Sequence, residues 1–253
     1  MSANNDSFFK TIFVAVALCL VCSVLVSYTA VSLKDQQKAN ASLDKKKNIL
    51  IAANMLDETT DVAKTFENFE RKFVDLETGK FVEVGNAETF DQRQMAKDPA
   101  TSVIIEEDTA RIKRRSKVAS IYLVKDAGKV KTIILPIHGS GLFSTLYGFV
   151  ALESDKQTVV GLKFYEHGET PGLGGEVDNA KWLATWPGKK LLDSNAKLAL
   201  ELVKGGATKD TEVDALSGAT MTTNGINNML KYWLGDDGFG PFLSRFDVDK
   251  GEA

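Results

Sequence analysis

Residues 118–165 read VASIYLVKDAGKVKTIILPIHGSGLFSTLYGFVALESDKQTVVGLKFY, and this stretch decides the fold. It contains four runs rich in β-branched and aromatic residues, which is typical of strands: 118–124, 130–137, 146–152 and 159–165. The links between these runs are only five to eight residues long. Parallel neighbours would need crossovers of about a dozen residues. We therefore expect a largely antiparallel sheet with packed helices, in an α+β domain.

Downstream of this sheet, the segment Asp214-Ala215-Leu216-Ser217-Gly218-Ala219-Thr220 stands directly before a predicted helix. Apolar residues recur at helical spacing over 221–234, and Gly235 is the expected stop. Free N–H groups and the macrodipole make a helix N-terminus favourable for a phosphate. Hydroxyl-bearing side chains crowd this one: Ser217, Thr220, Thr222 and Thr223. They indicate either helix capping or a phosphate site.

A second concentrated signal is the segment 167–176, HGETPGLGGE, which directly follows the last predicted strand. Residues Thr170 to Leu173 fit a type II turn, in which Pro171 fixes φ and Gly172 supplies a positive φ. The alternatives are a plain glycine-rich turn and a seat for a ligand.

Two glycines follow this turn, and they leave the backbone open to a flat ligand on which Leu173 would pack. A metal site built from His167, Glu169 and Glu176 is disfavoured, because no second histidine at helical spacing accompanies them. The other histidine, His138, ends a predicted strand and suits a structural role.

The N-terminal run from Thr11 to Leu33 contains no charged residue. At ~1.5 Å per residue it reaches about 34 Å, enough to cross a hydrocarbon core of ~30 Å. A signal peptide is the alternative, but the run is longer than a signal h-region and no small-x-small cleavage site follows. We expect an uncleaved anchor in the lipid bilayer. Both cysteines, Cys19 and Cys22, lie inside this run, so no disulfide is expected in the rest of the chain.

The remaining segments are less regular. Patterning predicts helix over 43–80, an irregular or mobile connection over 87–116, a short helix over 178–186 and a further strand over 198–203. The net charge is −3, which argues against a nucleic-acid partner.

The two concentrated segments together resemble the FMN-binding domain of certain membrane redox complexes. The segment 214–220 is similar to the flavinylation motif D-x-x-S/T-G-A-T, and every fixed position matches: Asp214, Ser217, Gly218, Ala219 and Thr220. The segments 136–139 and 141–149 further resemble the NqrC family, whose members belong to the sodium-translocating NADH:quinone reductase. The length and the single span are similar as well. Phe143 departs from the tryptophan expected in that family.

The resemblance implies a covalent FMN, held through a phosphoester on Thr220 and attached by a separate flavin transferase. A threonine hydroxyl is a weak nucleophile, which is why an enzyme is needed. The expected ring contacts are Thr170, Gly172, Leu173 and Gly174. Lys204 is expected to stabilise reduced, anionic flavin, and Asp214 to serve transferase recognition or the local turn. No catalytic residue of the chain's own is expected.

The resemblance also implies an electron-transfer component of a multi-subunit complex in the bacterial inner membrane. Electrons are expected to arrive from an iron centre of neighbouring membrane subunits and to leave for a flavin on NqrB, with NADH oxidation and quinone reduction on other chains. It implies a periplasmic domain, although the lysines after the span favour the cytoplasm by the positive-inside rule. The expected divisions are a tail (1–10), a transmembrane helix (11–33), a connecting region (34–116) and an FMN-binding domain (117–253).

Two alternatives remain at this point. One is RnfG, the homologous flavin protein of an Rnf-type ferredoxin:NAD oxidoreductase, which the 136–149 match and the chain length disfavour. The other is an anchored extracytoplasmic scaffold without a cofactor.

Overall fold

The computed structural model describes residues 8–253, so most of the predicted tail lies outside the described residues. The chain divides into two compact units, residues 1–45 and 46–253. Helix α1 (Phe8–Ser32) has a window of mean hydropathy 2.5 and none of that window is buried. It is the one helix among residues 8–253 that is long and apolar enough to cross a membrane, and it lies where the sequence predicts the transmembrane helix. Helix α2 (Lys34–Ala52) follows it and ends in the second unit.

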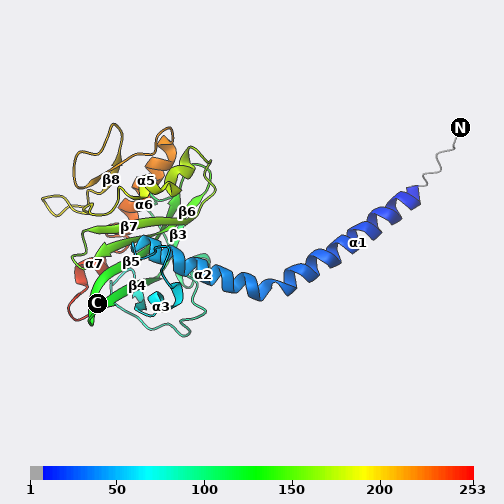
Figure 1. Cartoon of the computed structure of the whole chain (residues 1–253), viewed down its shortest axis with the longest axis horizontal. Coiled ribbons are helices and arrows are strands. Elements are labelled where there is room, and N and C mark those ends of the chain that lie inside the picture. The colour runs from blue at the N-terminus through cyan, green and yellow to red at the C-terminus, as the bar shows by residue number, and fades with distance from the viewer. Residues whose placement is uncertain (1–7) are drawn as a thin grey trace. The chain divides into compact units, whose positions relative to one another are not determined.

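The second unit contains one large sheet, two small strand pairs and several helices (Figure 1). Its elements are α3 (Val62–Phe66), β1 (Phe69–Asp75), α4 (Gln92–Lys97), β2 (Ser102–Ile104), β3 (Arg114–Ser116), β4 (Val118–Asp126), β5 (Lys129–Ser140), β6 (Thr145–Glu153), β7 (Val159–Glu166), the 3-10 helix η1 (Gly174–Asp178), α5 (Ala180–Leu183), β8 (Glu201–Val203), β9 (Glu212–Asp214), α6 (Thr220–Leu234) and α7 (Gly240–Arg245).

The large sheet has the order β1-β4-β5-β6-β7, and each neighbouring pair is antiparallel. Ile134 at its centre lies opposite Tyr122 of β4 and Ala151 of β6. The short links of the 118–165 stretch allow only such hairpin connections. The predicted antiparallel α+β fold is therefore confirmed.

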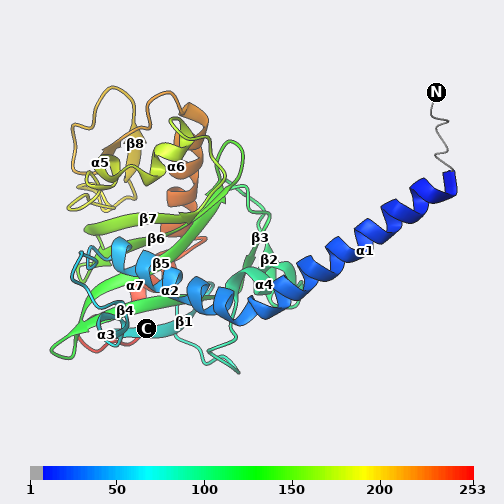
Figure 2. The ribbon, with the colours of Figure 1, turned by 45° about the vertical axis from the view of Figure 1, so that its right-hand side comes forward.

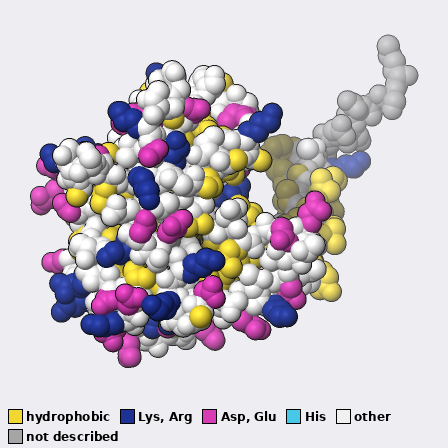
Figure 3. All heavy atoms as spheres, turned by 60° about the vertical axis from the view of Figure 1, so that its left-hand side comes forward, with side chains coloured by type: hydrophobic (Ala, Val, Ile, Leu, Met, Phe, Trp, Pro, Cys, Tyr) yellow, Lys and Arg dark blue, Asp and Glu magenta, His cyan; other side chains and the backbone are white. Residues whose placement is uncertain are grey.

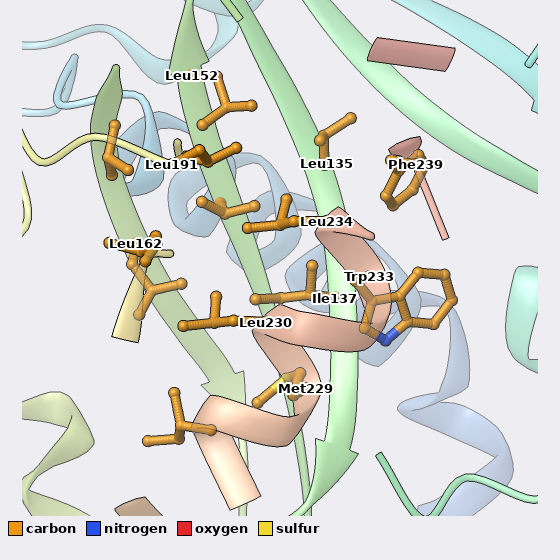
Figure 4. Close-up of a cluster of buried hydrophobic side chains, with 14 of the residues drawn as sticks. Leu135, Ile137, Leu152, Leu162, Leu191, Met229, Leu230, Trp233, Leu234 and Phe239 are labelled. Carbon is orange, nitrogen blue, oxygen red and sulfur yellow. The ribbon is translucent and has the colours of Figure 1, made fainter. Parts of the chain in front are cut away.

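Each face of the sheet is covered by helix. Ile49 and Leu50, in the last turns of α2, pack against one face together with Phe149, and Figure 2 shows the end of α2 lying across the strands there. The opposite face packs against α6 in the larger core of Figure 4, which joins Leu135, Ile137, Leu152 and Leu162 of the sheet to Met229, Leu230, Trp233 and Leu234 of the helix. The apolar stripe predicted over 221–234 is this buried face of α6.

Two glycines set the separation between α6 and β5. A Cβ on Gly225 of the helix would lie 2.2 Å from the carbonyl oxygen of Ser140. A Cβ on Gly139 of the strand would lie 2.9 Å from the Cβ of Met229. Neither position has room for a side chain, so the helix rests directly on the strand backbone. Trp233 Nε1 then donates a hydrogen bond to the carbonyl of His138 at 2.6 Å.

The prediction of helix over 43–80 is correct only for the end of α2 and for α3, and residues 69–75 form a strand instead. This segment forms strand β1, which pairs with β4 from Phe69 opposite Val124 to Asp75 opposite Val118. Phe66, Phe69 and Phe73 recur at a spacing that a helix would also use, and Phe69 and Phe73 share one face of a strand equally well. Pairing with the open edge of β4 satisfies the backbone and decides between the two.

The connection over 87–116 is more ordered than its polar sequence indicates. It contains α4 and the β2–β3 hairpin, and Arg93 of α4 attaches it to the sheet. The Arg93 guanidinium lies 3.4 Å from the centre of the Tyr147 ring and 2.8 Å from Glu166 Oε2. These partners lie far away in the sequence, so local patterning did not reveal them.

The later segments follow the predictions with shorter bounds. The helix over 178–186 is formed by the end of η1 and by α5, and the strand over 198–203 is β8, which pairs in parallel with β9. The face drawn in Figure 3 intersperses basic and acidic side chains, in keeping with a net charge of −3.

Replacing Gly225 by Ala should destabilise the protein, because the added Cβ meets backbone that cannot move without opening the α6–β5 contact. We expect a loss of about 1–3 kcal/mol in the free energy of unfolding. Gly85→Ala is the matched control, since nothing lies within 4 Å of its added Cβ. Thermal unfolding of both variants of the full chain in detergent checks this, and equal melting temperatures would contradict the close packing.

Candidate functional site

The segment 214–220 is a turn that joins the end of β9 to the first residue of α6. The N-cap of α6 is Ala219, which has no side chain that can cap the helix, so the predicted capping by a hydroxyl is not found. Thr220 is the first helical residue and is exposed, as is Ser217. The helix therefore presents the free N–H groups of its first turn beside the exposed hydroxyl of Thr220.

The other two hydroxyls of the cluster point into the protein. Thr222 Oγ1 donates a hydrogen bond to Glu169 Oε2 at 2.7 Å. Thr223 Oγ1 accepts one from the backbone N–H of Leu216 at 3.3 Å. Both threonines are buried, so the four hydroxyls divide into two that hold the turn and two that face outward.

Asp214 stabilises the neighbouring turn. Its Oδ1 accepts a hydrogen bond from the backbone N–H of Ala207 at 2.6 Å. Because β8 and β9 are parallel, with Val203 opposite Asp214, both strands end at the same edge. Exposed Lys204 directly follows β8 at that edge. The structure thus shows the local-turn role considered for Asp214 and places Lys204 beside the strand that leads into the motif.

The glycine-rich segment forms the predicted type II turn. The N–H of Leu173 donates to the carbonyl of Thr170 at 3.1 Å, and Gly172 has φ +77. The Leu173 side chain is exposed, and its Cδ2 lies 3.4 Å from where a Cβ on Gly218 would stand. The two segments that the sequence singles out, 167–176 and 214–220, therefore lie against each other.

Glu169 joins the 167–176 segment to the β5–β6 loop and to the first turn of α6, and the sequence did not identify this role. The residue is 5% exposed, and its carboxylate accepts five hydrogen bonds: from the N–H groups of Leu142, Phe143 and Ser144, from Ser144 Oγ, and from Thr222 Oγ1. Burial alone would raise the pKa of this carboxyl, but the bonds from Thr222 and the loop N–H groups outweigh burial and lower its pKa. Glu169 is therefore an ionised, fully bonded buried carboxylate at neutral pH.

The position of the same carboxylate explains why two neighbouring residues have to be glycine. A Cβ on Gly174 would lie 2.5 Å from Thr222 Oγ1 and 2.6 Å from Glu169 Oε2, and a Cβ on Gly141 would lie 2.6 Å from Glu169 Oε1. Gly174 thus makes room for the buried acid, a different reason from the predicted open backbone for a ligand. Its predicted ring contact stays a prediction.

The disfavoured metal ligands each have another partner. Glu169 is saturated by its donors, His167 Nε2 lies 2.8 Å from Asp178 Oδ2, and Glu176 Oε2 accepts from Asn179 Nδ2 at 2.6 Å. Asp178 also pairs with Lys163. Burial alone would raise the pKa of Asp178, but its interactions with Lys163 and His167 outweigh burial and lower that pKa.

His138 has the structural role that the sequence indicated. Its ring stacks on Tyr147 and contacts Trp233, with centroids 5.4 Å and 4.9 Å apart. Burial, with a smaller contribution from Arg93, lowers the pKa of His138 to about 4. The ring is therefore neutral at physiological pH.

The site has what a flavin phosphate and ring require. The uncapped first turn of α6 offers N–H groups to a phosphate, and Thr220 offers a hydroxyl beside them. Apolar side chains are exposed on the three surrounding segments: Leu142, Phe143, Leu173 and Met221. A flat aromatic ligand would cover these side chains. The residues present therefore fit FMN.

Comparison with known proteins agrees with this geometry. The family model described as FMN-binding domain matches residues 141–235. The C subunit of the Na(+)-translocating NADH-quinone reductase of Vibrio vulnificus (strain YJ016) is 52% identical over 248 residues, covering 96% of this chain and 97% of the relative. The protein of the same name from Haemophilus ducreyi is 48% identical over 253 residues, covering 98% of each.

Two solved structures are also similar. The crystal structure of Shewanella oneidensis NqrC matches with a TM-score of 0.76 and 37% identity, over 81% of this chain and 98% of that one. The crystal structure of the corresponding protein from Parabacteroides distasonis matches with a TM-score of 0.67 and 28% identity, over 85% of this chain and 98% of that one.

Proposed function

Since the chain belongs to the NqrC family of the Na+-translocating NADH-quinone reductase, we propose that it carries FMN covalently on Thr220 and relays electrons between redox centres of that complex. The observation that carries this proposal is the position of Thr220. Its exposed hydroxyl stands at the uncapped N-terminus of α6, and the Leu173 turn packs beside Gly218 in the same motif.

The chain's residues bind and orient the cofactor. The first turn of α6 holds the phosphate, and Ser217, Gly218 and Ala219 leave its approach open. Thr170, Gly172, Leu173 and Gly174 are the proposed ring contacts. FMN supplies the electron-transfer chemistry when bound, while the protein sets its position and its potential. We assign this function to residues 117–253.

Attachment requires a flavin transferase, because the threonine hydroxyl needs activation. Thr220 is exposed, whereas Thr222 and Thr223 are buried and hydrogen-bonded. This division supports Thr220 as the hydroxyl that the transferase reaches. The other partners are the remaining subunits, which carry the NADH and quinone sites, and the lipid bilayer around α1.

Family membership removes RnfG as the leading alternative. A cofactor-free scaffold remains the rival of a different class, and it predicts a chain that never acquires flavin.

Replacing Thr220 by Leu should abolish covalent flavin, because no hydroxyl remains to form the phosphoester. The measurement is flavin fluorescence of the denatured chain on a gel, after expression with the transferase. Thr208→Val, in the turn before β9, is the control and should stay fluorescent. A dark wild-type band would favour the scaffold, and a fluorescent Thr220→Leu band would place the tether elsewhere.

Replacing Lys204 by Gln should make the midpoint potential of the bound flavin more negative, because a cation stabilises reduced, anionic flavin. A tenfold loss of that stabilisation corresponds to about 59 mV for one electron. Redox titration of the flavinylated chain checks this, with Lys197→Gln as the control. Equal potentials for the two variants would remove Lys204 from the site.

The proposed location of the domain is the periplasm, with α1 as a single-pass anchor in the inner membrane. A cysteine at position 197 should react with a membrane-impermeant maleimide in spheroplasts, after Cys19 and Cys22 in the span have been replaced by Ser. Labelling that appears only after the inner membrane is permeabilised would place the domain in the cytoplasm, as the lysine distribution favours.

A further inference from the structure

The Glu169 carboxylate connects segments that are far apart in the sequence. Its five hydrogen bonds reach the β5–β6 loop at Leu142, Phe143 and Ser144 and the first turn of α6 at Thr222. Ser144 Oγ also accepts from the N–H of Gly168, which ties the loop to the segment that carries Glu169. One buried acid therefore joins three segments.

Each of these segments presents an apolar side chain outward. Phe143 is 70% exposed, although its N–H is bonded to Glu169 at 3.0 Å. Met221, 51% exposed, precedes Thr222, and Leu173 extends from the turn that follows Glu169. Leu173 lies against Gly218 of the motif, and Met221 directly follows exposed Thr220. The bonds to Glu169 are what fixes their backbones relative to one another.

The bonds are suited to a fixing role. Bonds from N–H and O–H groups to a carboxylate are stronger than bonds between neutral groups. The carboxylate is buried, so water does not compete for it. The space left by Gly141 and Gly174 admits both of its oxygens. A purely structural acid could have the same geometry, so the difference between the two roles has to be seen in the flavin.

We propose that Glu169 is a positioning residue for the flavin. By joining the β5–β6 loop, the 167–176 segment and the first turn of α6, it holds Phe143, Leu173 and Met221 as a fixed seat for the ring of an FMN tethered on Thr220. The inference rests on the proposed covalent FMN. Glu169 acts through these segments and does not itself have to touch the ring.

The test compares Glu169→Gln with Glu176→Gln in the full chain, in detergent, after maturation by the transferase. Both changes remove one carboxylate from the same segment, but the Glu176 carboxylate bonds to exposed Asn179 and not to the loop. Two quantities are measured. Amide hydrogen exchange of residues 142–144 reports on the loop, and time-resolved fluorescence anisotropy reports on the rotational freedom of the flavin ring.

We expect exchange at residues 142–144 to become roughly tenfold faster in Glu169→Gln, because the amide group presents a donor where the loop needs an acceptor. We expect faster flavin depolarisation in this variant, with Glu176→Gln like the wild type in both measurements. Faster exchange with unchanged depolarisation would overturn the inference and leave Glu169 a structural acid. Unchanged exchange would overturn it as well.

If Glu169→Gln does not fold or take up flavin, the Thr222→Val variant tests the inference in its place. This variant keeps the side-chain shape and removes one of the five bonds, so an increase in flavin mobility is expected and an unchanged anisotropy overturns the inference. A dark band from wild-type chain overturns the proposed function, and this inference with it. A fluorescent wild-type band with an equally immobile ring in the variants overturns only the role of Glu169.

Discussion

The close contact between α6 and β5 is the constraint on which the rest of the structure depends. Gly139 and Gly225 let the helix rest on the strand backbone, where even a methyl group would collide. This contact places the N-terminus of α6 beside the end of β5. The loop that leaves β5 and the turn that follows β7 then meet the same helix terminus, and the candidate site is the place where these segments converge.

Within that site, burial divides the four hydroxyl side chains into two that stabilise the turn and two that face the solvent. Thr222 and Thr223 face inward, where they bond to Glu169 and to the backbone of Leu216. Thr220 and Ser217 face outward and leave the first turn of the helix open to a phosphate. Four similar side chains in one short segment thus have two roles. Thr222 finds its partner 53 residues away, at Glu169, so the sequence of the helix alone does not show which hydroxyls are buried.

The sequence was sufficient where local pattern and short links decide the structure. The strands of the 118–165 stretch, the apolar stripe of α6 and the turn at Gly172 all follow from periodicity and turn chemistry. It failed at Phe69–Asp75, where a spacing compatible with a helix became a strand through pairing with β4. Glu169 was not recognised as the hub of the site, because its donors lie 25 to 53 residues away. Long-range hydrogen bonds leave no periodic trace in the chain.

The covalent attachment of FMN to Thr220 is the central claim, and peptide mass spectrometry of the matured chain tests it most directly. Cleavage after Lys209 and Lys231 releases residues 210–231, which contain Thr211 and the four clustered hydroxyls of Ser217, Thr220, Thr222 and Thr223. The account predicts that this peptide is heavier by FMN less one water, and that fragmentation places the added mass on Thr220. An unmodified peptide, or the same mass on Thr211, Ser217, Thr222 or Thr223, would contradict it.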